Sequence, residues 1–509
     1  MGLLVGLPSA AGAGELRAAR GYGVPGGTVS ALLLTLGWAP LSIVNASSGM
    51  LNPPDGHPGP TEVPCMGRRI VIVGGGAAGI GAAGAAKGTD PAAEVIVYTQ
   101  YQDAAYSPCG IPYVHGKEIP DFERLFLGTK QQYAEQGIDI RYETEVTAFD
   151  PKAKTVTVDG RPVEYDSLVV ATGFTYADPG VPGGELSGLY YVKNIREAME
   201  WDKVLDGVRK AVVVEATPLG LEMVTALCHR GIETHLIDPS PWALSMATDP
   251  DIAKPVEDSW IELGAQLHFN TKLEAFQGSG GALRSVRTSA GELECDLAVV
   301  CTHKVANTAL ATAAGIDLGS AGGIVVDERM STHVPWVWAA GDCIEVPHGV
   351  SNVPVQGLSG SHAYAQGKVA GVNAAGGRRA YQPVYVPWGM VAGTWMIGGV
   401  SFSETLATAL GIPFVMGRAQ GISRARYFPG VQPVTVKLLA EPGSLRIIGA
   451  QMVGGEGIKE RADFLAMAVR TGITARDLAT MENVYSPAIG ALNEPIALAA
   501  QDLLARAGT

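Results

Sequence analysis

Two stretches of the chain carry residue types and spacings suited to redox chemistry. One is the glycine-rich turn Gly74-Gly75-Gly76-Ala77-Ala78-Gly79, which follows the apolar run Ile70-Val71-Ile72-Val73. Such a turn offers backbone N–H groups and a helix N-terminus to a pyrophosphate. The other is Cys109, in the run Tyr106-Ser107-Pro108-Cys109-Gly110-Ile111-Pro112-Tyr113. Because a cysteine beside a redox ring can cycle between thiolate and oxidised sulfur, the two stretches together predict a dinucleotide cofactor next to a redox-active sulfur.

Each stretch also has a simpler interpretation. A chain rich in Gly and Ala can produce G-x-G-x-x-G by chance, but here a strand precedes the turn, an alanine-rich helix follows it and a second apolar strand comes next. A free cysteine is most often a small buried apolar side chain. The glycine, prolines and tyrosines around Cys109 instead favour an irregular loop or the entrance to a helix.

The elements that must position these residues alternate between strand and helix from Met66 onward, which indicates an α/β fold built from βαβ units. One strand ends in Ala171-Thr172-Gly173, and a later apolar strand ends in the carboxylate of Asp342. Beyond Tyr381 the composition changes to that of a separate α+β domain. The predicted strands are residues 70–73, 95–98, 168–170, 210–214, 234–238, 336–342 and 434–439, and the predicted helices are residues 79–87, 219–230, 458–470 and 494–506.

Composition narrows the class of protein. With 509 residues and 47% hydrophobic content the chain can bury several cores, about three domains with an additional segment. A formal net charge of −13 without a basic cluster argues against nucleic acid and against anionic membrane surfaces as partners. The six cysteines are scattered and form no C-x-x-C pair, which fits a reducing compartment, so we expect a cytoplasmic protein.

Residues 1–65 are treated separately because they are rich in Gly, Ala and Pro. Their apolar run, residues 28–44, is short for a membrane span, but with Arg17 and Arg20 upstream it faintly resembles a secretion signal. Met66 leads directly into the first strand, and the cysteine usage does not suit export. We therefore favour a disordered extension or a misassigned start codon.

The motifs resemble those of the FAD-dependent pyridine nucleotide-disulfide oxidoreductases, and most closely the branch of coenzyme A-disulfide reductase and NADH oxidase, which has a single redox-active cysteine. The resemblance covers residues 66–509. It implies two Rossmann-like domains, an FAD-binding domain interrupted by an NAD-binding domain, and a C-terminal α+β dimerisation domain. The predicted boundaries are residues 66–180 and 304–380 for the FAD-binding domain, 181–303 for the NAD(P)-binding domain and 381–509 for the dimerisation domain.

The resemblance also assigns residues. Asp342 would hold the ribityl chain of FAD, and the chain would work as a homodimer in which Tyr427 and Tyr485 reach Cys109 of the partner subunit. A phenol can protonate a leaving thiolate, although either tyrosine could equally pack at an interface. For NAD, Gly220 and Asp238 match the family pattern. The FAD contacts implied are Gly74, Gly76, Ala77, Ala78, Gly79, Thr99, Val146, Ala171, Thr172, Gly173, Gly341 and Asp342.

Departures from the family pattern bear on the substrate. Relatives such as lipoamide and glutathione reductase carry a C-x-x-x-x-C disulfide, but position 114 is Val114 here. A lone thiolate can form a mixed disulfide with a small thiol, attack a persulfide or become a sulfenic acid. Ala105 and Pro108 replace polar residues near the cysteine of coenzyme A-disulfide reductases. The site would therefore lack polar contacts to the sulfur.

Positions in the first helix and the first glycine turn also differ from the family pattern. Coenzyme A-disulfide reductases hold the nucleotide end of coenzyme A with polar and basic groups on the first helix, where this chain has Ala85 and Gly88. A multiply phosphorylated substrate would miss those contacts. Ala77 takes the place of the histidine found in the peroxidase type, which argues against peroxide chemistry.

Both nucleotide sites depart too. Thr99 replaces the acid that usually binds the adenosine ribose of FAD. The second phosphate turn reads Glu215-Ala216-Thr217-Pro218-Leu219-Gly220, in which only the last glycine survives. A side chain at 217 hinders a pyrophosphate, and Glu215 places an anion near another anion. Asp238 nevertheless suits the ribose hydroxyls of NAD and disfavours NADP. Either NADH binds weakly or another donor supplies the electrons.

These observations predict a flavoprotein oxidoreductase that passes electrons from NADH through FAD and Cys109 to a small disulfide, persulfide or polysulfide. One alternative is an NADH oxidase that reduces oxygen. The other is a flavin-bearing electron-transfer partner of another protein, with a vestigial nicotinamide site.

Overall fold

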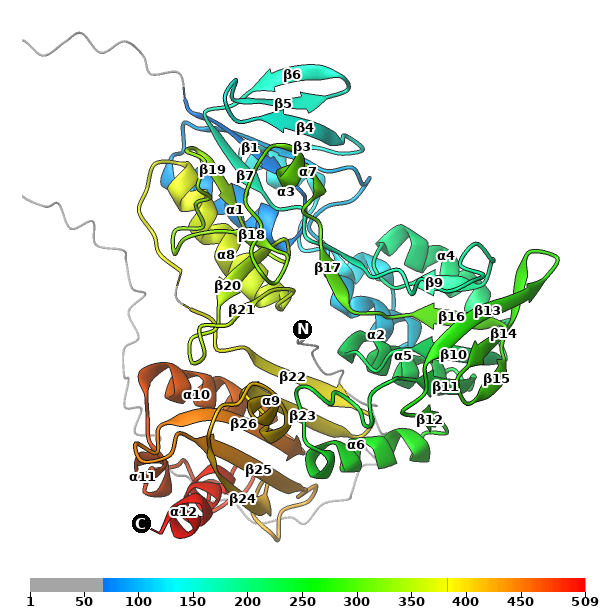
Figure 1. Ribbon diagram of the computed structural model, residues 1–509, viewed down its shortest axis with the longest axis vertical. Helices are drawn as coiled ribbons and strands as arrows, with labels where there is room; N and C mark the ends of the chain where they lie inside the picture. The colour runs from blue at the N-terminus through cyan, green and yellow to red at the C-terminus, as the bar shows by residue number, and fades with distance from the viewer. Residues whose placement is uncertain (1–66, 382, 509) are drawn as a thin grey trace, which may run out of the picture. The chain divides into compact units, whose positions relative to one another are not determined.

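The computed structural model describes residues 67–381 and 383–508, and its first layer is a five-stranded parallel sheet (Figure 1). The strand order is β19-β7-β1-β2-β3, so the order reverses between β1 and β7. The central strands are almost wholly apolar, as expected of strands covered on both faces. The strands are β1 (Arg69–Val73), β2 (Glu94–Tyr98), β3 (Ile138–Arg141), β7 (Ser167–Val170) and β19 (Val337–Ala339).

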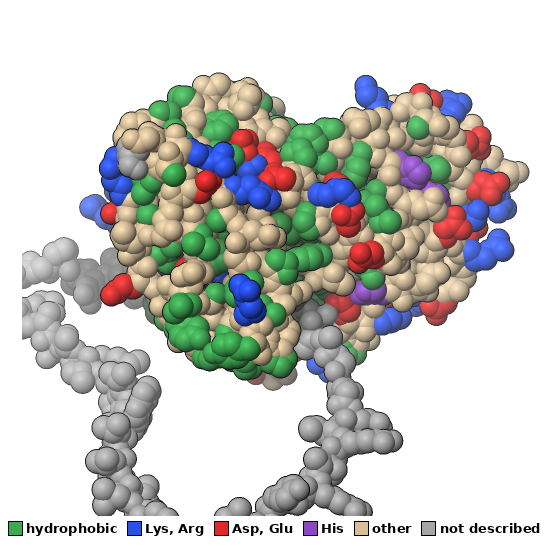
Figure 2. Space-filling view, turned by 90° about the horizontal axis from the view of Figure 1, so that it is seen from below, with side chains coloured by type: hydrophobic (Ala, Val, Ile, Leu, Met, Phe, Trp, Pro, Cys, Tyr) green, Lys and Arg blue, Asp and Glu red, His purple; other side chains and the backbone are tan. Residues whose placement is uncertain are grey.

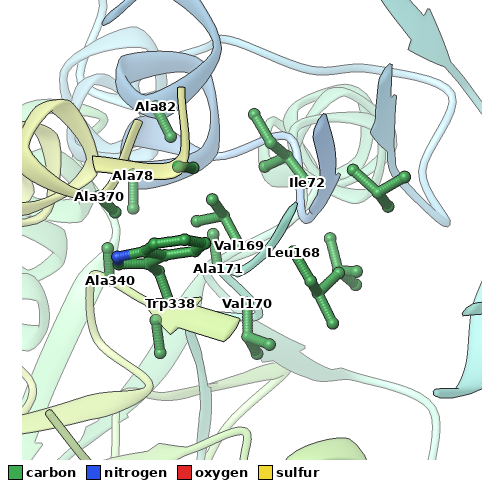
Figure 3. Packing of buried hydrophobic residues seen from close by; sticks show 14 of the residues in the cluster. Ile72, Ala78, Ala82, Leu168, Val169, Val170, Ala171, Trp338, Ala340 and Ala370 are labelled. Carbon is green, nitrogen blue, oxygen red and sulfur yellow. The ribbon is translucent and has the colours of Figure 1, made fainter. Parts of the chain in front are cut away.

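Helices α1 (Ala77–Thr89) and α8 (Gly360–Ala374) pack against each other beside this sheet. A Cβ atom on Gly367 would lie 2.0 Å from the carbonyl oxygen of Ala78, so only glycine allows the approach. Figure 3 shows the small side chains of Ala78 and Ala370 close to the Trp338 ring in this core. A segment late in the sequence is thereby joined to the first βαβ unit.

Smaller elements lie beside the first sheet, except that α2 and η2 pack in the apolar core of the next parallel sheet. An antiparallel sheet of β4, β5 and β6 lies beyond the first sheet (Figure 1), and short helices follow β2 in the chain. Their bounds are β4 (Val146–Asp150), β5 (Thr155–Val158), β6 (Arg161–Glu164), η1 (Pro108–Gly110), α2 (Ile111–His115), η2 (Phe122–Leu125), α3 (Lys130–Glu135), α7 (Ala309–Ala313), β18 (Ile324–Val325), β20 (Ile344–Pro347) and β21 (Pro354–Val355).

A second parallel sheet has the order β12-β11-β10-β16-β9, and its order reverses between β10 and β16. The chain enters and leaves this region through β8 (Phe174–Tyr176) and β17 (Lys304–Ala306), which pair with each other antiparallel. The other elements are β9 (Leu189–Tyr191), α4 (Ile195–Leu205), β10 (Lys210–Val214), α5 (Pro218–His229), β11 (Glu233–Ile237), α6 (Pro250–Glu262), β12 (Gln266–His268), β13 (Leu273–Ser279), β14 (Ala282–Thr288), β15 (Gly291–Glu294) and β16 (Leu297–Val300).

The C-terminal region is a five-stranded antiparallel sheet, ordered β22-β23-β26-β25-β24, with its own apolar core. Helices α10 and α12 pack against this sheet. The elements are β22 (Pro387–Ala392), β23 (Trp395–Ser401), α9 (Glu404–Ala409), β24 (Val415–Ile422), β25 (Pro433–Ala440), β26 (Ile447–Gly454), α10 (Ile458–Thr471), α11 (Ala475–Ala479) and α12 (Pro495–Ala507).

The fold confirms the α/β prediction, and each strand and helix predicted from the sequence is present, with ends that differ by a few residues. Cys109 lies in η1, directly before α2, so the predicted helix entrance is also correct. The expectations for residues 1–65 concern a segment outside the described residues. In the part of the chain that the structure describes, no helix is long and apolar enough to cross a bilayer.

Candidate active site

The first glycine turn is tightly constrained on one side and open on the other. Gly74 has φ +115°, and a Cβ there would lie 2.2 Å from the carbonyl oxygen of Ala171. A Cβ on Gly79 would lie 1.9 Å from the oxygen of Gly74. By contrast, a Cβ on Gly76 or Gly173 would meet nothing within 4 Å. The turn therefore holds its own shape and opens onto space at the N-terminus of α1, where a phosphate group is favoured.

The side of the turn that faces the end of β2 has a different lining. Thr99 directly follows β2 and is buried, and a Cβ on Gly75 would lie 3.2 Å from the Cβ of Thr99. The Thr99 hydroxyl accepts a hydrogen bond from the backbone N–H of Tyr101 at 3.3 Å. Val146 begins β4 and is buried in the core of the first sheet. Thr99 thus lies against the turn, whereas Val146 is held in the apolar core.

The carboxyl ends of β7 and β19 meet near the start of α1. The Thr172 hydroxyl donates to the carbonyl of Asn307 at 2.6 Å. Gly341 has φ +88°, and a Cβ there would lie 2.8 Å from that of Ala78 and 3.5 Å from that of Ala363. The residues assigned to FAD on three separate segments of the sequence are therefore gathered at one edge of the sheet.

Asp342 forms an ion pair that the sequence analysis did not find. The Lys304 ammonium donates to the Asp342 carboxylate at 2.8 Å and to the carbonyl of Leu358 at 3.0 Å. The two charged side chains are only 12% and 10% exposed. Lys304 also lies 4.4 Å from the ring centroid of Phe174, with the Lys193 ammonium 4.5 Å from the same ring.

The Lys304 and Lys193 side chains are largely shielded from solvent. Burial lowers the pKa of Lys193 to about 8, Asp342 opposes that shift, and Lys304 adds to it. Nothing in the local sequence distinguishes Lys304 or Lys193. The pairing of β8 with β17 brings Lys304 to Phe174, and Lys193 comes from the segment that follows β9.

Cys109 occupies the first turn of the short helical segment that begins at Pro108. Gly110 allows η2 to pack closely, since a Cβ there would lie 2.2 Å from Leu125 Cδ2. The pKa of the Cys109 thiol is raised to about 11, mostly by burial and in part by the Glu222 carboxylate, with Lys304 opposing both effects. The thiol is thus influenced by charges from α5 in the second parallel-sheet region and from β17.

Glu222 is a buried acid in an otherwise apolar stretch of α5. Its carboxylate accepts a hydrogen bond from the Tyr113 hydroxyl at 3.3 Å. Burial raises the pKa of Glu222 to about 8, the bond from Tyr113 opposes that shift, and Glu118 reinforces it. A buried acid in an apolar helix was a sequence signal for this residue. Glu222 joins the helix of the second nucleotide turn to the segment that carries Cys109.

Tyr427 and Tyr485 come together as a pair, with 3.1 Å between their hydroxyl oxygens. They are 75% and 46% exposed, and Val484, Ile489 and Leu492 beside them in the chain are exposed as well. Figure 2 shows the molecule from below the view of Figure 1, with hydrophobic side chains exposed in patches on that face. The structure describes no contact between either tyrosine and Cys109 of the same chain.

The second nucleotide turn follows β10. Glu215 has φ +71°, and its carboxylate accepts a hydrogen bond from the backbone N–H of His303 at 3.1 Å. Thr217 caps α5, because its hydroxyl accepts from the Gly220 N–H at 3.2 Å. Asp238 accepts from the Ala216 N–H at 2.6 Å. Gly220 and Asp238 therefore lie at the same turn, as predicted.

Two parallel sheets, each with a strand–turn–helix at the point where its strand order reverses, and a lone cysteine near the first of them define a dinucleotide-dependent redox protein. Residues 68–367 match the pyridine nucleotide-disulphide oxidoreductase family, and residues 389–494 match the dimerisation domain of that family. The chain belongs to this family, whose members are FAD-dependent and use NAD(P)H.

The relatives include enzymes named for different electron acceptors. The chain is 34% identical to an NADH oxidase of Methanocaldococcus jannaschii over 444 residues, which is 86% of this chain and 98% of the relative. It is 28% identical to an NAD(P)H coenzyme A polysulfide/persulfide reductase of Pyrococcus horikoshii over 454 residues, 86% of this chain and 99% of the relative. The solved NAD-dependent persulfide reductase from A. fulgidus is 30% identical, with a TM-score of 0.83 over 86% of this chain and 84% of that one.

Proposed function

We propose that the protein passes electrons from NADH through FAD and Cys109 to a small disulfide, persulfide or polysulfide. The observation that carries this proposal is Cys109, a lone thiol at the start of a helix. The Glu222 carboxylate raises the pKa of this thiol and the Lys304 ammonium lowers it. The family membership and the similarity to persulfide reductases support it.

The residues present fit FAD. The open positions at Gly76 and Gly173 leave room beside the α1 N-terminus, and the paired Asp342 and Lys304 lie within the same region. The turn would bind the pyrophosphate, Thr99 the adenosine ribose and Asp342 the ribityl hydroxyls. When bound, FAD supplies the two-electron chemistry that links a nicotinamide to a sulfur.

The sulfur chemistry belongs to Cys109. Its thiolate attacks one sulfur of a disulfide RSSR, forms Cys–S–S–R and releases RS⁻, which takes up a proton. Two electrons and one proton then reduce the mixed disulfide to the Cys109 thiolate and a second RSH. The sum is NADH + RSSR + H⁺ → NAD⁺ + 2 RSH.

The tyrosine pair has a place in this scheme. In a homodimer built through the C-terminal domain, Tyr427 and Tyr485 would approach Cys109 of the partner subunit and protonate the departing RS⁻. Their mutual hydrogen bond and their exposure in a single chain support a role that a second subunit completes. Asp238 would hold the ribose of NADH.

An NADH oxidase is the second candidate, favoured by the 34% identity to the enzyme of Methanocaldococcus jannaschii. Stopped-flow mixing of the FAD-loaded protein with NADH separates these functions. Fast loss of flavin absorbance followed by reoxidation with polysulfide supports the reductase, and stoichiometric oxygen consumption supports the oxidase. Slow reduction by NADH would contradict both and point to a flavin-bearing electron-transfer partner.

A further inference from the structure

Glu215 occupies the crevice in which a nucleotide should bind. In an open parallel sheet, ligands bind beyond the carboxyl ends of the strands, where the strand order reverses. That point lies here between β10 and β16. Glu215 directly follows β10, and its carboxylate reaches the N–H of His303, a few residues beyond β16. The side chain therefore spans the reversal point.

The backbone explains why this residue is more than a surface acid. Glu215 has φ +71°, a conformation that favours glycine. The turn is also closed, because a Cβ on Gly220 would lie 2.2 Å from the carbonyl oxygen of Glu215. The backbone of Glu215 is therefore held next to the start of α5, where a pyrophosphate would lie, and the His303 N–H holds its carboxylate across the reversal point.

An ionised carboxylate and a pyrophosphate repel each other at this position. A neutral carboxyl group, in contrast, carries an O–H donor that can bond to a phosphate oxygen. The pKa of Glu215 is raised to about 7, mostly by burial and in part by the Asp238 carboxylate, with the His303 N–H opposing both effects. The ionisable groups on the surrounding segments are Asp238 after β11, Cys301 after β16 and the His303 side chain.

We propose that Glu215 gates the second nucleotide site by its protonation, so that NADH binds to the neutral form and binding takes up a proton wherever Glu215 was ionised. The inference rests on the proposed use of NADH. When Glu215 is ionised, the protein, one proton and NADH combine to give a complex in which the Glu215 carboxyl group is neutral. The gate makes the supply of electrons to Cys109 depend on pH near neutrality.

The test is nucleotide binding to the FAD-loaded protein, with ADP-ribose as the probe because it carries the pyrophosphate and does not reduce flavin. Calorimetric titrations at pH 6, 7 and 8, in buffers of different ionisation heat, give both Kd and protons taken up. For a group that titrates near 7, the wild-type Kd should weaken about tenfold from pH 6 to pH 8. Glu215→Gln should bind with a Kd that does not change over this range.

Two further variants keep the result decisive. Glu215→Gly suits the positive φ and should also bind independently of pH, which covers a folding failure of Glu215→Gln. His303→Asn keeps the backbone N–H and should retain the wild-type pH dependence. Loss of that dependence in His303→Asn, or its persistence in Glu215→Gln and Glu215→Gly, would overturn the gate and leave the NADH function intact. Failure of all four proteins to bind ADP-ribose, together with slow reduction by NADH, would overturn both.

Discussion

At the scale of single residues, the site depends on how a buried sulfur keeps or loses its proton. The pKa of Cys109 is raised to about 11, mostly by burial and with the opposing effect of Lys304 included, so the thiol is protonated at neutral pH. Lys304 is the positive charge acting on it here, and it is shared with Asp342. We infer that Cys109 is inert as an isolated thiol and reacts only when the assembled site withdraws its proton.

The first prediction concerns Cys109→Ser. The variant should keep its flavin but lose reduction of polysulfide and small disulfides by roughly a thousandfold or more, because serine cannot form the sulfur–sulfur intermediate. Direct reaction of the flavin with oxygen should survive. The matched control is Cys228→Ser on α5, which should reduce polysulfide like the wild type. Undiminished turnover in Cys109→Ser would show that Cys109 is a packing residue.

At the scale of elements, local patterns could be predicted and contacts between distant segments could not. The strand at Lys210–Val214 and the helix ending near Arg506 follow from unbroken local patterns. No helix was predicted over α6, which contains Pro255, a residue that usually ends a helix. Lys304 was missed because its position depends on how β17 packs against segments far away in the sequence. Glu222, a lone acid in an apolar helix, had a local signal, but its contact with the Cys109 segment could be seen only in the folded chain.

The second prediction tests the contact between α1 and α8. Gly367→Ala would place a methyl group 2.0 Å from the Ala78 carbonyl, so α8 must move away from α1 and from the Gly341 segment. We expect a lower Tm and faster release of FAD, measured as the rise in free-flavin fluorescence on heating. Gly84→Ala is the matched control, because its Cβ would meet nothing within 4 Å. That change should raise helix stability by up to about 1 kcal/mol. Equal FAD retention in both variants would contradict the role of this contact.

At the scale of the whole chain from 67 to 508, a buried ion cluster ties the second parallel-sheet region to the C-terminal sheet. The Lys437 ammonium on β25 lies 2.8 Å from Asp249, the N-cap of α6, and 3.0 Å from Asp251, and it also pairs with Glu404. The Lys437 and Asp249 side chains are 5% and 4% exposed. The cluster therefore fixes α6 against the antiparallel sheet of the C-terminal dimerisation domain.

The third prediction is that Lys437→Met destabilises the protein by about 3–5 kcal/mol at neutral pH, because it leaves the Asp249 charge buried and unpaired. Lys254→Met is the matched control. It removes an exposed lysine from α6, the helix that Asp249 caps, and should change the Tm little. Burial alone would raise the pKa of Asp249, but hydrogen bonds from Lys437 and Gln451 outweigh it and hold that pKa below its usual value of 3.8.

The pH dependence gives that prediction a second readout. An acid with a lowered pKa stabilises the folded state above its unfolded value, and this contribution is lost as the pH falls through the folded value. In Lys437→Met, Asp249 has lost its cation and takes up a proton more readily. The Tm difference between wild type and variant should therefore be largest near neutrality, begin to shrink as the pH falls through the pKa that burial raises in the variant, and go on shrinking toward the lowered pKa of Asp249 in the wild type. A Tm difference that stays constant from pH 7 to pH 3 would show that Lys437 stabilises the protein by packing alone, and that the ion cluster does not hold α6 in place.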